Sequence, residues 1–173
     1  MYPKEYIHYL IHFHGDRDYF ECHEILEEYW KKTDPGNKES IWVGFIQLAV
    51  ASYHHRRKNF KGAERTLGKS IHIFNQSIDR LEEFGLDPDR FQKDLSYMKK
   101  QIQEKASYTS YCFPFSDLKL VTQCKKECQK RGLKWDSDSD LENEHLIHRH
   151  TLRDRSEVIE ERLQALNKKK TGS

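Results

Sequence analysis

Hydrophobic residues recur every three or four positions along most of this chain, and the strict alternation typical of strands is hard to find. A period of three to four residues predicts helices rather than strands. Glycine and proline are scarce, with 8 and 4 among 173 residues, so few positions interrupt the helices. The pattern therefore predicts an all-α protein: a compact bundle of about four helices, followed by a C-terminal helical arm.

Capping and turn residues set the expected bounds of these helices. We expect helices over about 4–31, with a break near Gly15, over 39–58, from Ala63 through Leu81 with Gly85 as C-cap, and from Asp87-Pro88 onward. The 39–58 segment is apolar nearly all round. That distribution indicates a central, buried helix.

Residues 1–105 and 106–173 differ in character, and we assign the first to the bundle and the second to an extension. An aromatic loop over 108–115 is expected to dock on the bundle, and the acidic, serine-rich 136–144 segment reads as a mobile linker. Beyond it, Ile159, Leu163 and Leu166 form a narrow apolar stripe on a predicted terminal helix. A short helix is marginal alone in water, so this arm should dock on the bundle, on a protein partner or on a second copy.

Composition narrows the class of protein. Lys and Arg together number 30 and Asp and Glu 28, so no overall charge draws the chain to nucleic acid or to a membrane. The first residues lack a signal-peptide pattern, and the apolar stretch 41–51 is about half of a membrane span. The 4 cysteines do not suggest a disulfide scaffold. We expect a cytoplasmic protein that does not bind nucleic acid, since no reader motif is present.

One helical face near the start carries the candidate chemistry. His23, Glu27 and Trp30 fall within roughly 60° of the helix surface, among apolar residues. Ionisable groups on a buried helix face are expected either to have hydrogen-bond or ion-pair partners or to belong to a functional site. In the 39–58 helix, Gln47 and His54 lie seven residues apart on one side, and we expect this polar stripe to face His23 and Glu27.

A first interpretation of this face is a metal site. A histidine and a carboxylate four residues apart can ligate one ion, and these donors suit zinc, manganese or iron. Two ligands are not enough. The candidates for a third and fourth are His54, His55, Gln47, Asp16 and His12.

A second interpretation is structural, and it is the default until a third ligand is found. A buried bond between His23 and Glu27, extended to Gln47 and the Trp30 indole, would fix the register of the first two helices. Breaking such a buried pair costs about 3–5 kcal/mol. Catalysis, with His23 as general base oriented by Glu27, lacks a recognisable nucleophile or oxyanion donor. Whether the protein is an enzyme stays open.

This motif and two later segments together resemble a known protein family. His23-x-x-x-Glu27-x-x-Trp30, the segment 44–51 and Asn59-x-x-Gly62-Ala63 together resemble DUF309, a bacterial and archaeal family of unknown function. The resemblance covers roughly residues 6–74 and implies a small helical bundle with a candidate metal site at the motif. The 39–58 helix and its successor also resemble a tetratricopeptide helix pair, although no second copy follows at a fixed period.

These observations lead to two classes of function. The first is a protein that binds a divalent metal or a small ligand between its first two helices. The alternative is a protein-interaction or scaffold module in which the His/Glu/Trp motif is purely structural.

Overall fold

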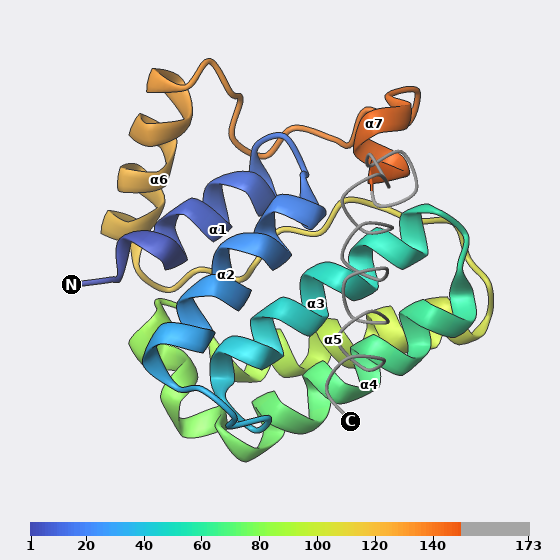
Figure 1. Ribbon diagram of the computed structural model, residues 1–173, viewed down its shortest axis with the longest axis horizontal. Helices are drawn as coiled ribbons and strands as arrows, with labels where there is room; N and C mark the ends of the chain where they lie inside the picture. The colour runs from blue at the N-terminus through green and yellow to red at the C-terminus, as the bar shows by residue number, and fades with distance from the viewer. Residues whose placement is uncertain (150–173) are drawn as a thin grey trace, which may run out of the picture.

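The computed structural model describes residues 1–149, and helices make up most of this part of the chain (Figure 1). In chain order they are α1 (Lys4–His14), α2 (Tyr19–Thr33), α3 (Ile41–Arg56), α4 (Phe60–Gln76), a 3₁₀ helix η1 (Ile78–Phe84), α5 (Pro88–Gln103), α6 (Leu118–Lys130) and α7 (Glu144–Ile147). The predicted all-α class is confirmed. The predicted terminal helix with Ile159, Leu163 and Leu166 lies outside the described residues.

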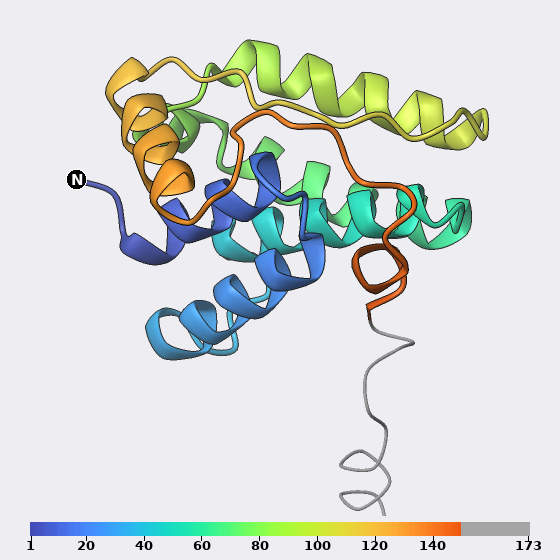
Figure 2. The same ribbon diagram turned by 90° about the horizontal axis from the view of Figure 1, so that it is seen from above.

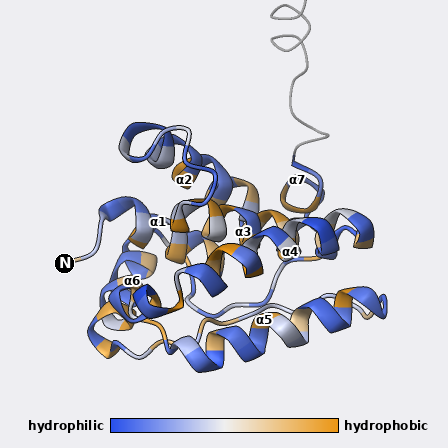
Figure 3. Cartoon of the chain, turned by 90° about the horizontal axis from the view of Figure 1, so that it is seen from below, coloured by the Kyte–Doolittle hydropathy of each residue, from blue (hydrophilic) through white to orange (hydrophobic). Residues whose placement is uncertain are grey.

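Helix α3 is the centre of the bundle, as its apolar sequence predicts. It packs on α2 and on α4, α1 packs on α2, and α5 packs on α4 (Figure 2). The hydropathy colouring shows hydrophobic residues along α3 and hydrophilic residues over much of α5 (Figure 3). A close approach of α3 and α4 depends on Gly44, where an added Cβ would lie 3.0 Å from Ile73 and 3.1 Å from Phe74. The Ser70 hydroxyl also donates to the Gly44 carbonyl at 2.8 Å.

The expected break near Gly15 is present and separates α1 from α2. Arg17 adopts a left-handed conformation, with φ of 57°, and the Asp18 carboxylate accepts the Glu21 N–H at 3.1 Å. Asp18 is thus the N-cap of α2. The turn directs α2 back along α1, which positions the face that carries His23.

The third predicted helix was too long. α4 ends at Gln76, and the chain continues as η1, which Gly85 terminates with φ of 74°. Ile78, Leu81 and Phe84 are spaced by three residues, and this period matches the three residues per turn of a 3₁₀ helix. The start of α5 was predicted correctly, because the Asp87 carboxylate accepts the Arg90 N–H at 3.2 Å and Pro88 opens the helix.

The chain after α5 wraps around the bundle. Residues 104–116 run back along α5 to α6, which packs on α1, and 131–143 then cross to α7 (Figure 2). The predicted linker is anchored by two buried arginines that the sequence analysis did not identify. Arg17 Nε donates to the Ser137 carbonyl at 2.8 Å, and Arg56 donates to the Ser139 hydroxyl at 3.2 Å.

No helix within residues 1–149 combines the length and the apolar character that crossing a membrane requires.

Candidate functional site

A groove of about 740 Å³ lies between α2, α3 and α4. The α2 side carries His23, Glu27 and Trp30, and α3 contributes Gln47 and Ile46. Helical spacing explains this arrangement, because residues 23, 27 and 30 share one face of α2. The structure thus brings the His/Glu/Trp motif and Gln47 to one cavity.

The floor of the groove is apolar. Ile46 and Ile73 are buried, Val43 is half-buried, and the half-buried Trp30 ring stands at one wall. At Gly68 of α4, an added Cβ would meet no atom within 4 Å, so the backbone there opens directly into free space. A ligand of moderate size therefore has both apolar contact surface and room.

The His23–Glu27 pair is formed but is not buried. His23 Nε2 lies 2.7 Å from Glu27 Oε2, and Lys31 Nζ lies 3.0 Å from the other carboxylate oxygen. The His23 and Glu27 side chains are 32% and 33% exposed. The Trp30 indole N–H donates to the Asn37 carbonyl at 3.0 Å, because the turn after α2 folds back over it. The expected buried network through Trp30 is therefore not present.

His54 does not line the groove, although Gln47 does. Seven residues of α-helix advance the chain by about 10.5 Å, so two positions on one side can lie at opposite ends of a groove. The His54 Nδ1 atom instead lies 3.2 Å from the Asn59 side-chain amide, at the turn into α4. His54 and Gln47 therefore lie on the same side of α3 but do not belong to the same site.

The donors that residues 1–149 bring to the groove do not fit a resident metal ion. Nowhere in residues 1–149 do three His, Cys, Asp or Glu side chains converge on one point. Of the other proposed ligands, His12 bonds Asp16 at 3.1 Å, and His55 Nε2 lies 2.8 Å from the Ala106 carbonyl oxygen. His23 and Glu27 thus remain two donors that bond each other.

The residues of the α4 wall of the groove were not predicted from the sequence. Arg65, Lys69 and His72 project from α4 at spacings of four and three residues, and Lys38 and Glu39 lie at the groove's loop end. Glu39 faces His72 at 3.5 Å. The spacing of Arg65, Lys69 and His72 was a visible signal, but a polar helix face usually faces solvent.

Charge at the groove is unevenly compensated. Glu27 is paired with His23 and Lys31, and Glu39 with His72. Among the described residues, no carboxylate forms an ion pair with Arg65, Lys69 or Lys38. The groove therefore offers cationic groups beside an apolar floor.

The groove lining in the described part of the chain includes no hydroxyl or thiol side chain. His23 has the geometry of a base oriented by a carboxylate, but within residues 1–149 no Ser, Thr, Cys or Tyr lines the groove beside it. The arrangement is suited to binding.

Replacing His23 by alanine is expected to lower the free energy of unfolding by less than about 1 kcal/mol, because the pair is partly solvated. Urea denaturation followed by circular dichroism measures this change. Leu26→Ala, on the same helix at a fully buried position, is the control and should cost about 2–5 kcal/mol. A loss near 3 kcal/mol for His23→Ala would restore the structural interpretation.

Comparison with known proteins gives two matches. The model of a family described as "Domain of unknown function (DUF309)" matches residues 6–66, which include α2, α3 and the beginning of α4. An "Uncharacterized protein YpuF" of Bacillus subtilis (strain 168) is 48% identical over 170 residues, covering 98% of each chain. No solved structure matches the chain.

Proposed function

The chain belongs to the DUF309 family, and we propose that in this protein the groove between α2, α3 and α4 binds a small organic anion with an apolar body. The observation that carries the proposal is a cavity of about 740 Å³ that places uncompensated cations beside an apolar floor. Ligand pockets of about 300–1,000 Å³ with a mostly apolar lining and a few convergent polar groups are typical of small-molecule sites.

The charged groups define the polar end of this ligand. Arg65 and Lys69 lie one turn apart on α4, so both can reach one anionic group. A guanidinium suits a carboxylate, sulfonate or phosphate because it can donate two parallel hydrogen bonds. Gln47, on α3, adds an amide that can both donate and accept.

The apolar groups define the other end. Trp30 offers a ring edge and face, and Val43, Ile46 and Ile73 form the floor. An aromatic or aliphatic body placed there would remove apolar surface from water, which stabilises a complex by about 25 cal/mol per Å² before association costs. The expected ligand is therefore amphiphilic rather than a bare inorganic ion.

Two fluorescent probes with the same ring system test the proposal. 8-Anilinonaphthalene-1-sulfonate carries a negative charge, and N-phenyl-1-naphthylamine does not. Gly68→Leu should weaken the binding of both probes, because its side chain enters the groove at a position where nothing obstructs it. The same substitution should not destabilise α4, because leucine is more favourable than glycine inside a helix, by less than about 1 kcal/mol.

The double variant Arg65→Ala/Lys69→Ala isolates the charge. Losing partly exposed charge contacts worth about 1 kcal/mol should weaken sulfonate binding about fivefold and leave the neutral probe nearly unchanged. Lys93→Ala/Lys100→Ala removes two cations from α5 and is the matched control. Equal sulfonate affinity in wild type and Gly68→Leu would exclude the groove as the binding site.

A further inference from the structure

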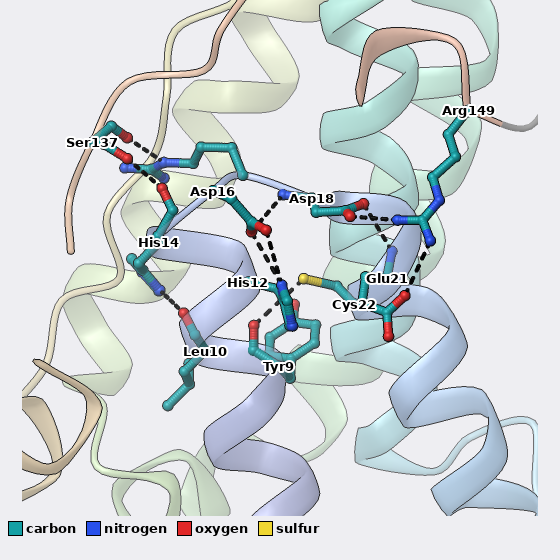
Figure 4. Close-up of polar contacts among 12 residues, drawn as sticks. Tyr9, Leu10, His12, His14, Asp16, Asp18, Glu21, Cys22, Ser137 and Arg149 are labelled. Carbon is teal, nitrogen blue, oxygen red and sulfur yellow. Dashed lines mark hydrogen bonds and ion pairs between the residues drawn. The ribbon is translucent and has the colours of Figure 1, made fainter. Parts of the chain in front are cut away.

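The described chain ends beside the groove. Arg149 reaches from the segment after α7 to Asp18 and to Glu21, whose Oε2 lies 3.4 Å from the guanidinium (Figure 4). The same guanidinium lies 5.3 Å from the centre of the Phe20 ring, and that ring lies 6.1 Å from the His23 ring. Residues 150–173 therefore begin at the α2 end of the groove.

The sequence of this segment matches the groove in polarity. Ile159, Leu163 and Leu166 form an apolar stripe at helical spacing. In a helix over 157–167, Glu160 flanks this stripe on one side, and Arg162 flanks it on the other. The groove has an apolar floor, Arg65 and Lys69 on its α4 wall, and Glu27 on its α2 wall. The Glu160 flank thus has a wall of opposite sign, because Arg65 and Lys69 form no ion pair with a carboxylate among the described residues.

The chain is also long enough. Residues 150–156 can span about 23 Å when extended, and a helix over 157–167 is about 16 Å long. From His23 to Trp30 the α2 wall extends about 10 Å along its axis. A short helix with one apolar stripe is marginal in water and gains stability when that stripe is buried.

We propose that residues 150–173 dock in the groove of their own chain as an amphipathic helix and compete with its ligand. Apolar anchors would lie on Val43, Ile46 and Ile73, in the manner of a helix bound in a hydrophobic groove. The competition rests on the proposed function, whereas the docking itself does not.

Methyl NMR on the full-length chain tests the docking without any ligand. Leu163→Asp places a charge in the stripe, and Gln164→Asp places the same charge on the opposite side of the predicted helix. The methyl resonances of Val43, Ile46 and Ile73 should shift in Leu163→Asp and stay in place in Gln164→Asp. Unchanged resonances in Leu163→Asp would overturn the proposal.

Docking between two copies is a separate outcome. In that case the wild-type methyl shifts would change on dilution, and Leu163→Asp would convert a dimer to a monomer in sedimentation. Either result would overturn docking within one chain. Concentration-independent shifts from a monomer are the expected result.

Binding of 8-anilinonaphthalene-1-sulfonate then separates the two proposals. Its affinity should increase at least severalfold in Leu163→Asp and match wild type in Gln164→Asp. Unchanged methyl shifts with normal probe binding would reject the docked segment and retain the ligand site. Shifted methyls with no probe binding in Leu163→Asp would retain the docking and reject the ligand site.

Discussion

Replacing Phe113 by alanine is expected to lower the free energy of unfolding by about 3–5 kcal/mol. Phe113 belongs to the loop between α5 and α6, yet it is only 4% exposed. Its ring centre lies 4.6 Å from that of Phe13, 5.4 Å from that of Phe91 and 6.3 Å from that of Phe45. Truncation would therefore open a cavity among side chains from α1, α3 and α5.

Urea denaturation of the full-length chain measures this loss. Tyr97→Ala is the control, because Tyr97 is 65% exposed on α5 and its removal should change stability by less than about 0.5 kcal/mol. Phe113→Leu keeps most of the volume and should cost less than about 1.5 kcal/mol. A loss below 1 kcal/mol for Phe113→Ala would show that this loop does not belong to the core.

Acidification below pH 6.5 is the second large expected effect, and His14 is its source. His14 is fully buried, its Nδ1 lies 2.9 Å from the Leu10 carbonyl oxygen, and its Nε2 accepts the Phe113 N–H at 3.0 Å. When Nδ1 carries the proton, the neutral ring donates to the Leu10 carbonyl and accepts from the Phe113 N–H. Protonation of Nε2 would place two N–H donors against each other. Burial is the main reason that the pKa of His14 falls to about 3.

The two pKa values of His14, unfolded and folded, determine how stability changes with pH. Between the unfolded pKa near 6.5 and the folded pKa of about 3, the unfolded chain binds a proton that the folded chain does not. This contribution to stability is complete above pH 6.5 and is lost as the pH falls, by up to about 1.4 kcal/mol per pH unit. Above pH 6.5 it does not vary.

Urea denaturation between pH 7.5 and 4 tests this dependence. His14→Gln can retain a donor and an acceptor but does not titrate, so its stability should fall less steeply with acid than that of wild type. His72→Gln, at an exposed position on α4, should keep the wild-type slope. Parallel pH profiles for wild type and His14→Gln would assign the acid sensitivity to other groups.

Local signals in the sequence predicted much of the fold. The Asp87-Pro88 start of α5, the break near Gly15 and the apolar α3 depend on residues within a turn or two. Contacts between distant segments were not predictable in this way. His14 stacks on Trp135 at 4.7 Å, and no periodicity relates positions so far apart in the chain. The error at the end of α4 arose because a three-residue period was read as a continuation of the α-helix.

In the candidate site, too, local sequence signals predicted the arrangement within one helix but not the contacts between helices. Periodicity within α2 placed His23, Glu27 and Trp30 on one face, and the structure brings Gln47 to the same cavity. The α4 wall with Arg65 and Lys69 could not be assigned, because its residues also fit an ordinary solvated face. His54 was misplaced because angular position on a helix says nothing about distance along the axis.

The two buried arginines have a consequence for the order of events during synthesis. Arg17 and Arg56 leave the ribosome early, but carbonyl groups that solvate them belong to Tyr111, Ser137 and Leu146. A nascent chain that stops short of these residues must either keep the guanidinium groups in water or bury charge that is compensated only in part, as by the bond from Arg56 to the Arg17 carbonyl, which is costly. We therefore expect the turn at Arg17 and the end of α3 at Arg56 to reach their final packing only after residues 137–146 have left the ribosome.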